Sequence, residues 1–381
     1  MTANEIAQLV RWFPLVDRPR PTYPPLAARA AEVRTLAGNI EHTTDPLLGA
    51  ARTLNRAALI ASDCGLPELA RELCWRQINP YRNAGRLTVP QAMHMLEPVV
   101  NLARLRLRAR DAEAAWASLS TLHHALKTNT HAVIEGWPLP TRDLIGSSEE
   151  YQELRIWTWR IYLSEGTRAL VRLGRWRAAL THIEQNKGIG LHLMDGRQVQ
   201  IVNACLAGNS NAAQTVLDHS TITQAWEAQV SACLAVLCRL AGDQNTDWET
   251  GRMIERYLAG VPEPGHGVYR TRLGLAVIDL AACAAPARVR PAYARLVNEA
   301  LGSADGYVAR EVVAHHWCRT HLSHTEEKSL TSMVETTGLG LGTIPVPLMA
   351  DLHKAAQTSE IAIERALNNT SALADQRVSG S

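Results

Sequence analysis

The sequence predicts an all-α protein built from antiparallel helical hairpins, and three observations lead to this prediction. Strong helix formers, chiefly alanine, leucine and arginine, dominate the composition, while phenylalanine occurs once, at Phe13. Apolar residues recur at intervals of three and four, as at Leu26, Ala30, Val33 and Ala37. Helix start and stop signals recur along the chain, and no segment shows a convincing strand pattern.

The expected elements begin with a short helix over 4–13 and a proline-rich connector over 14–25. Five prolines in this connector disfavour helix, because each lacks a backbone donor. Asp45 followed by Pro46 supplies an N-cap and a proline at the first helical position. Further helices are expected over about 26–38, 46–63, 67–79, 89–110, 112–127, 148–173, 175–186, 196–207, 209–218, 222–241, 246–259, 268–284, 288–302, 306–321, 324–337 and 347–368.

Two longer irregular stretches interrupt these helices. Residues 131–147 are expected to be a linker or a functional loop, because so long a connector is unusual in a compact helical protein. Residues 338–347, GLGLGTIPVP, are expected to be an interhelical loop, since no strand precedes them as a dinucleotide site requires. The expected division is an N-terminal helical cap over 1–45, hairpins over 46–130, the linker, helical repeats over 148–368 and a disordered tail over 369–381.

Four segments share one pattern at a junction between two helices. They are CGLPELARELC (64–74), ARDAEAAWASL (109–119), LGRWRAALTHI (173–183) and AGNSNAAQTVL (207–217). A turn residue is followed five positions later by alanine and, four positions after that, by an apolar side chain. The turn residues are Gly65, Arg110, Gly174 and Gly208, the alanines are Ala70, Ala115, Ala179 and Ala213, and the apolar residues are Cys74, Leu119, Ile183 and Leu217. We expect a left-handed turn, a close helix–helix approach at the alanine, and a buried apolar residue one turn later.

This pattern resembles the tetratricopeptide family, whose repeat is about 34 residues long. The third and fourth turn residues are 34 apart, whereas the first two spacings, 45 and 64, require inserted or degenerate segments. The resemblance covers roughly residues 50–220. The family's small residue in the first helix is matched by Ala58 and Ala103, but Thr167 and Ile201 replace it, and its tryptophan and proline are not matched. The resemblance implies a TPR-like α-solenoid of antiparallel helical hairpins.

In that family the first helices of successive hairpins line a concave groove that binds peptides or protein segments. When the family's groove-facing positions are matched to each hairpin of this sequence in turn, the resemblance assigns them to Arg52, Asn55, Arg104, Arg108, Arg168, Arg172 and Gln198. Arginine forks bind carboxylates through paired hydrogen bonds, so the expected ligand is acidic or bears a carboxylate. The alternative is that these arginines are solvated or form ion pairs with Glu150, Glu153 and Glu165.

Other candidate residues lie outside this pattern. Trp137, in the 131–147 stretch, is the tryptophan expected to face a ligand, whereas most of the other nine are expected in the core. Cys318, His321 and His324 are spaced by three, which would place a partial metal site on one helix face. This spacing matches no zinc pattern and lacks a fourth ligand, so no metal or other cofactor is expected. Glu311, four residues before His315, allows a simple ion pair on the helix.

Composition excludes several classes of partner. A net charge of +2 creates no global field for nucleic acid or an anionic membrane, so neither is expected as a direct partner. Seven cysteines without a CxxC indicate reduced, buried thiols. With no signal-peptide pattern and no apolar run near ~20 residues, a cytoplasmic location is expected. Abundant alanine and a strong excess of arginine over lysine suggest a bacterial source.

Three functions fit these observations. The first, which we expect, is a regulatory or accessory factor that binds a protein or peptide partner in an arginine-lined groove. The second is an enzyme or enzyme subunit that acts on a peptide or natural-product intermediate, although no P-loop, GxSxG or HExxH motif assigns a catalytic residue. The third is a structural scaffold that self-associates, for example as a homodimer.

Overall fold

The computed structural model describes the backbone of residues 3–379 and the side chains of residues 5–369. Eighteen α-helices and one short β-hairpin make up this described part, so the expectation of a mostly helical protein is confirmed. None of the described helices is both long and apolar enough to cross a membrane. The chain forms two compact units: unit 1 comprises Met1–Pro24 and Leu170–Thr337, and unit 2 comprises Pro25–Ala169 and Gly338–Ser381. The chain passes from one unit to the other at 24/25, at 169/170 inside the helix Ser148–Arg172, and at 337/338.

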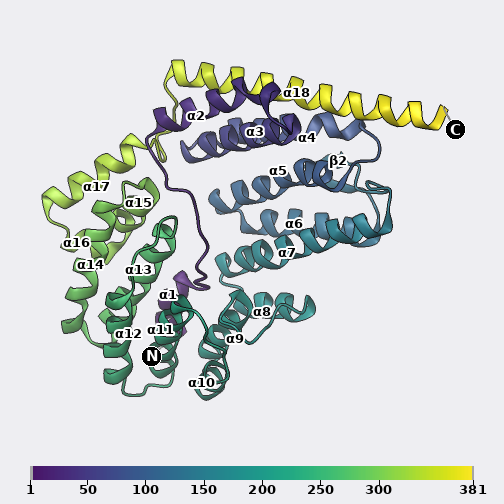
Figure 1. Cartoon of the computed structure of the whole chain (residues 1–381). Helices are drawn as coiled ribbons and strands as arrows, with labels where there is room; N and C mark the ends of the chain where they lie inside the picture. The colour runs from purple at the N-terminus through teal and green to yellow at the C-terminus, as the bar shows by residue number, and fades with distance from the viewer. Residues whose placement is uncertain (1–2, 380–381) are drawn as a thin grey trace. The chain divides into compact units, whose positions relative to one another are not determined.

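Unit 2 contains α2 (Leu26–Gly38), α3 (Pro46–Asp63), α4 (Pro67–Ile78), α5 (Val89–Arg108), α6 (Ala112–Thr128), most of α7 (Ser148–Arg172) and α18 (Val346–Ser379). Two 3₁₀ turns, η2 (Ile40–His42) and η3 (Asn79–Asn83), join them. From α2 to α6 each helix packs against the next, α3 also contacts α5, and α18 lies along α2 and α3 (Figure 1). The tail expected over 369–381 is helical as far as Ser379, and residues 380–381 lie outside the described part.

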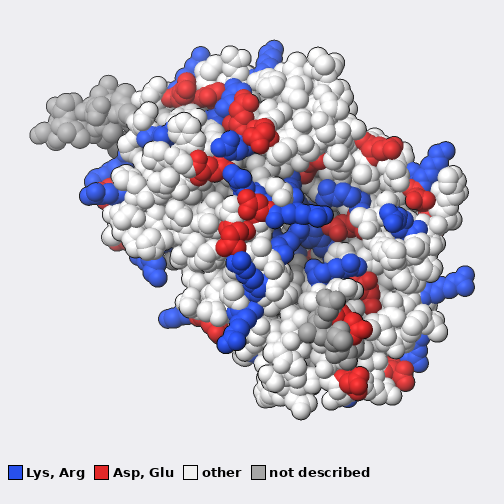
Figure 2. All heavy atoms as spheres, turned by 180° about the vertical axis from the view of Figure 1, so that it is seen from behind, with Lys and Arg blue, Asp and Glu red and all other residues white. Residues whose placement is uncertain are grey.

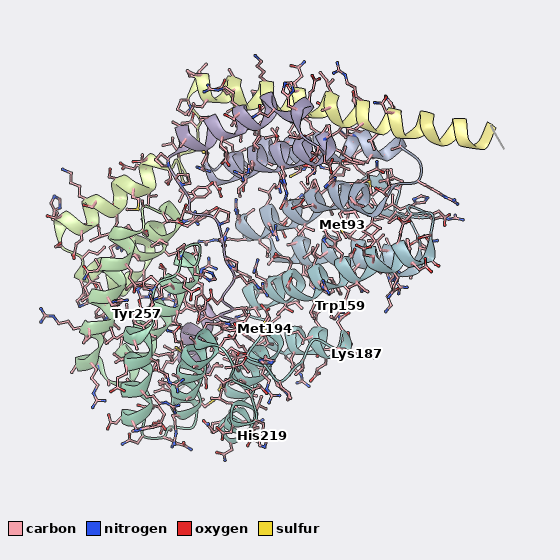
Figure 3. All side chains as sticks on the ribbon, viewed as in Figure 1. Met93, Trp159, Lys187, Met194, His219 and Tyr257 are labelled. Atoms are coloured by element: carbon pink, nitrogen blue, oxygen red, sulfur yellow. The ribbon has the colours of Figure 1, made fainter. Side chains whose placement is uncertain are left out.

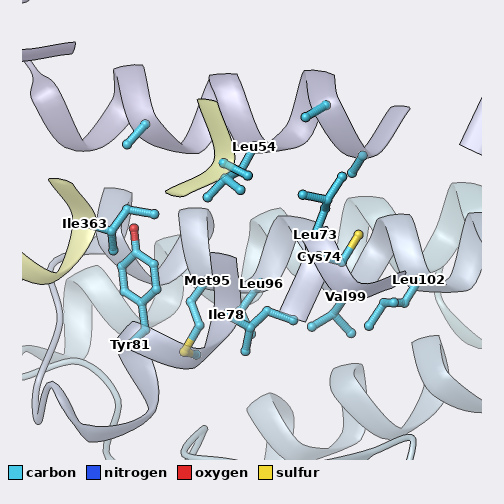
Figure 4. Close-up of a cluster of buried hydrophobic side chains, with 14 of the residues drawn as sticks. Leu54, Leu73, Cys74, Ile78, Tyr81, Met95, Leu96, Val99, Leu102 and Ile363 are labelled. Atoms are coloured by element: carbon cyan, nitrogen blue, oxygen red, sulfur yellow. The ribbon is translucent and has the colours of Figure 1, made fainter. Parts of the chain in front are cut away.

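Apolar side chains from these helices form one core in unit 2 (Figure 4). Leu54 of α3, Ile78 of α4 and Leu96 of α5 are fully buried in it, as is the ring of Tyr81. Ile363 reaches the same core from α18, more than 280 residues further along the chain than Tyr81. The C-terminal helix is therefore an integral layer of unit 2.

The 131–147 stretch contains a β-hairpin that the sequence did not predict. Strands β1 (Ala132–Ile134) and β2 (Trp137–Leu139) are antiparallel, with Ala132 opposite Leu139. Glu135 and Gly136 form the turn with φ of 50° and 84°. Strands of three residues are too short to show alternation, which explains why the expectation of no strand was wrong.

Unit 1 begins with α1 (Ala3–Leu9), η1 (Val10–Trp12) and an extended segment over 13–24. Its helices then follow in order as α8 (Trp176–Gln185), α9 (Asp195–Leu206), α10 (Ser210–Asp218), α11 (Ala225–Ala241), α12 (Asp247–Ala259), α13 (Gly267–Ala284), η4 (Pro286–Arg288), α14 (Val289–Gly302), α15 (Gly306–Ala314), α16 (His316–His321) and α17 (His324–Thr336). From α8 to α15 each α-helix contacts the next, and α9, α11, α13 and α15 also contact one another in succession.

Close packing within unit 1 depends on a glycine. The side chain of Tyr257, on α12, is buried against α13 (Figure 3). A Cβ at Gly274 would lie 2.5 Å from the Tyr257 hydroxyl, so α13 can approach only with glycine at this position.

The four junctions predicted from the sequence share one geometry. The turn residues Gly65, Arg110, Gly174 and Gly208 have φ of 80°, 63°, 69° and 76°. The next residue donates its N–H to the carbonyl five positions earlier, at 2.9–3.0 Å in all four cases. The alanine is fully buried each time, and the apolar residue after it is at most 6% exposed. The expected left-handed turn and buried alanine are therefore confirmed. The same left-handed turn, without the alanine pattern, recurs at Asn129, Lys187 and Asp243, where the next residue again donates its N–H to the carbonyl five positions earlier.

Arg110 is the one non-glycine turn residue among the four predicted junctions, and its side chain is exposed. We predict that Arg110→Gly raises the free energy of unfolding by about 1 kcal/mol, because glycine adopts this conformation without steric cost. Urea unfolding followed by circular dichroism measures the change. The matched control is Gly208→Ala, which should destabilise by a similar amount because alanine is strained at a φ of 76°, while its Cβ meets nothing within 4 Å. Equal stability of Arg110→Gly and wild type would contradict the prediction.

Candidate functional site

A hollow in unit 2 lies between α3, α4 and α5. Its empty volume is about 330 Å³, which includes the open solvent at its mouth. The lining residues are Asn55, Ala58, Leu59 and Ser62 of α3, Ala70 and Cys74 of α4, and Asn101, Arg104, Leu105 and Arg108 of α5. Three of the predicted groove residues, Asn55, Arg104 and Arg108, are among them.

The two long helices present the same pattern to the hollow. The lining residues of α3 and those of α5 both follow the spacing i, i+3, i+4 and i+7. This spacing forms one stripe along a helix, so a single face of each helix points into the hollow. Ala70, the alanine of the first junction, lines the hollow from α4.

Glu165 of α7 pairs with two of the predicted arginines. Arg104 approaches Oε1 of Glu165 through Nη2 at 2.8 Å and Nε at 3.1 Å, and Arg168 approaches Oε2 at 2.8 Å. The Glu165 side chain is 7% exposed, whereas those of Arg104 and Arg168 are 48% and 45% exposed. Pairing with Glu165 was the alternative that the sequence left open for these arginines, and both arginine side chains remain partly exposed.

Asp63, at the end of α3, pairs with Arg108 in a similar way. Arg108 Nη1 lies 2.9 Å from Asp63 Oδ1, and Arg108 also donates to the Ser62 hydroxyl. Arg29 of α2 lies 3.7 Å from the other oxygen, Oδ2. The Asp63 side chain is almost fully buried, whereas that of Arg108 is 40% exposed. Each buried carboxylate therefore lies behind an arginine that reaches into the hollow.

Two amides connect α3 and α5 across the hollow. Asn101 Nδ2 donates to Asn55 Oδ1 at 2.9 Å, and Asn55 donates to Glu97 at 3.3 Å. Arg104 Nη1 donates to Asn101 Oδ1 at 3.1 Å, which joins the amides to the Glu165 cluster. Below them Cys74 is buried, and burial raises the pKa of its thiol to about 12, so the thiol is protonated at neutral pH.

The other predicted groove residues lie elsewhere. Arg52 is exposed on α3 and does not line the hollow. Arg172, at the end of α7, is exposed and belongs to unit 1. Gln198 of α9 also belongs to unit 1, where it is fully buried. Its Oε1 accepts from the Leu15 N–H at 2.7 Å, and its Nε2 donates to the carbonyls of Leu15 and Leu193, both at 2.6 Å.

Trp137 lies on β2 and is 52% exposed. Its ring centroid is 6.3 Å from that of Trp75, and the Arg82 guanidinium carbon is 5.6 Å from its centre. The adjacent turn residue, Glu135, accepts hydrogen bonds from Arg71 Nε at 2.6 Å, Arg106 Nη2 at 2.9 Å and Trp75 Nε1 at 3.2 Å. The hairpin that carries Trp137 is therefore fastened to α4 and α5.

The structure does not gather Cys318, His321 and His324 into a ligand set. α16 ends at His321 and a new helix begins at His324, so the three residues do not share one helix. Cys318 is buried, and burial raises the pKa of its thiol to about 12. The His321 ring is exposed and stacks on Trp317 with centroids 3.9 Å apart. Among the described residues no group of three potential ligands is placed to hold a metal.

His315 takes part in a buried cluster that the sequence did not indicate. Asp279 of α13 accepts from Trp12 Nε1 at 2.7 Å, Arg11 at 2.8 Å and His315 Nε2 at 2.9 Å. Burial raises the pKa of Asp279, but these hydrogen bonds outweigh it and hold the pKa below its ordinary value. The spacing allowed an ion pair between Glu311 and His315, but Glu311 pairs with Arg272 at 2.7 Å and His315 with Asp279 at 2.9 Å. His315 instead ends α15 in an extended conformation and caps α16, which splits the helix expected over 306–321.

Searches of protein-family models, curated proteins and solved structures find no match to this chain. Basic and acidic side chains are interspersed over the face of the molecule seen in Figure 2. The candidate site is therefore defined by its local geometry: exposed arginine edges, paired amides and an apolar floor.

The Glu135 cluster yields a prediction of pH dependence. Burial raises the pKa of Glu135, but hydrogen bonds from Arg71, Trp75 and Arg106 outweigh it and hold the pKa below 4.5. A carboxyl group whose pKa is lowered on folding stabilises the fold at pH values above its ordinary pKa. This stabilisation is lost as the pH falls through the pKa of the folded state. We predict that Glu135→Gln lowers the free energy of unfolding by about 2 kcal/mol at pH 7, with a smaller difference below pH 4.5.

Urea unfolding at several pH values measures this difference. The matched control is Glu68→Gln, because Glu68 approaches the same Arg71 at 3.9 Å but is 87% exposed. It should change stability by less than about 0.5 kcal/mol. A Glu135→Gln variant as stable as wild type at pH 7 would show that the cluster does not hold the hairpin.

Proposed function

We propose that this protein is a binding module, a TPR-like stack of antiparallel helical hairpins that holds an acidic or carboxylate-bearing segment of a protein or peptide partner. The site is the hollow between α3, α4 and α5. One observation carries the proposal: Arg104 and Arg108 line the hollow with partly exposed side chains, while the carboxylates that pair with them are buried.

The charge balance of the hollow supports an anionic ligand. Arg104 and Arg108 are the charged residues among those that line it, and both are basic. Their carboxylate partners, Glu165 and Asp63, are buried. A ligand carboxylate would accept charge-assisted hydrogen bonds from these oriented arginines.

The floor of the hollow supports an apolar side chain beside that carboxylate. Ala58, Ala70, Leu105 and the protonated Cys74 line the space, and Leu59 is 40% exposed at its edge. An apolar side chain in this space would lose contact with water and add to the affinity. The Asn55–Asn101 amide pair lies beside it and suits the backbone of an extended segment. The proposed ligand is therefore an extended segment with an acidic residue next to an aliphatic one.

We predict that Arg104→Gln/Arg108→Gln lowers affinity for such segments by about 100-fold, because two charge-assisted hydrogen bonds are lost. A positional-scanning peptide library identifies the preferred sequence on wild type, and fluorescence anisotropy measures the dissociation constants. Folding should persist, because Arg168 still pairs with Glu165 and Arg29 with Asp63.

The matched control is Arg34→Gln/Arg365→Gln, which removes two exposed arginines of unit 2 that pair with Asp351 and Glu41. This control should bind as wild type does. Selection of peptides without acidic residues by wild type, or equal affinity of all three proteins, would refute the proposed function.

A further inference from the structure

We propose that unit 1 carries a second binding groove, for an extended proline-rich segment with basic and aromatic side chains. The groove is the face formed by α9, α11, α13 and α15, and residues 10–24 of this chain fill it as an internal ligand. A partner segment of the same chemistry displaces them. This groove lies in unit 1 and is independent of the ligand of the hollow in unit 2.

The groove holds the backbone of the N-terminal segment as a peptide site holds a ligand. Gln198 binds both the N–H and the C=O of Leu15. The N–H of Arg20 donates to Gly265 O at 2.7 Å, and the N–H of Tyr23 donates to Asp305 Oδ2 at 3.2 Å. The carbonyl of Tyr23 accepts from Gly306 N at 3.4 Å. These contacts run from α9 to the start of α15 and recognise an extended backbone whatever its side chains.

Three apolar side chains anchor the segment. Phe13 and Leu15 are each 2% exposed and Tyr23 is 5% exposed. The ring of Tyr23 packs on that of Tyr307, with centroids 4.4 Å apart. The α1 and η1 turns that precede Phe13 contact α9, α11 and α13, and Figure 1 shows this purple segment beside α11 and α13. Deeply buried anchors at intervals along an extended chain are typical of peptide recognition.

The charged contacts of the groove match a basic segment. Asp195 pairs with Arg18, and Asp279 pairs with Arg11 at 2.8 Å. The Arg20 guanidinium carbon lies 5.2 Å from the centre of the Tyr307 ring. In the Asp17–His266 pair, by contrast, the segment supplies the acidic side chain. Arginines of the segment thus meet aspartates of the helices, the reverse of the polarity proposed for the hollow in unit 2.

Two features make the segment separable from the unit that binds it. The helices α8 to α17 are continuous in sequence and pack directly on one another, so the segment is not a layer between them. The side chains of Arg18 and Arg11 remain 42% and 48% exposed, and ion pairs this exposed contribute little. Prolines at 14, 19, 21 and 24 keep the segment out of helix and favour an extended conformation before binding.

The test uses the full chain with a site-specific protease sequence inserted between Pro24 and Pro25. After cleavage, a fluorescein-labelled peptide of residues 5–24 is added, and anisotropy reports binding while mass spectrometry reports release of the original fragment. We expect the cut protein to exchange its fragment for the peptide and to keep its circular dichroism spectrum. The uncut protein should bind the peptide at least about tenfold more weakly, because the tethered segment competes at high effective concentration.

Backbone recognition is tested with modified peptides. A peptide N-methylated at Leu15 should bind the cut protein about tenfold more weakly, because it cannot donate to Gln198. The matched peptide N-methylated at Val16 should bind as the unmodified one does. In a Gln198→Ala protein, the Leu15 and Val16 peptides should bind equally.

Three results would overturn the proposal. Loss of helical structure when the fragment leaves, or no exchange, would make residues 10–24 an integral part of the fold. Equal binding of a scrambled peptide of the same composition would show that the groove does not select this sequence. A dimer of the uncut protein in sedimentation analysis, with segments exchanged between copies, would make a second copy the occupant in place of a partner.

Discussion

The structure depends on one constraint, the close approach of two helices at each hairpin junction. A residue with positive φ ends the first helix within one turn, and a fully buried alanine five positions later lets the second helix pack against it. The same hydrogen bonds recur at Gly65, Arg110, Gly174 and Gly208, in both compact units. The turn fixes how the first helix of the hairpin is rotated about its own axis. A residue at a given distance before the turn therefore always lies on the same face of that helix.

This register explains which side chains are available for binding. Asn55 lies ten residues before Gly65, and Gln198 lies ten residues before Gly208. Each is a carboxamide on the first helix of its hairpin; Asn55 pairs with another amide, and Gln198 binds the backbone of Leu15. The two proposed sites would therefore share one recognition element and differ in charge, with arginines in the hollow of unit 2 and aspartates in the groove of unit 1.

The sequence predicted most of the helices and the four junctions, because periodicity and turn chemistry are local. Three residues that the family resemblance assigned to a groove, Asn55, Arg104 and Arg108, line the hollow. The sequence could not predict contacts that depend on the fold. Glu165 was considered as a partner of the arginines, but Asp63 was not, since its burial arises only when α2 and α5 pack around it. The partner of Gln198 is 183 positions away, and no local signal links it to Leu15. Short strands and an extended cap at His315 were missed for a similar reason, because tertiary contacts to Glu135 and Asp279 stabilise them.

We propose that first-helix faces of this protein hold an extended chain by its backbone. Residue-resolved hydrogen–deuterium exchange on the intact chain tests it most directly. We expect the amides of Leu15, Arg20 and Tyr23 to exchange much more slowly than the other amides of residues 15–24, because Gln198, Gly265 and Asp305 accept from them. Exchange of all these amides at the rate of an unstructured peptide would contradict it.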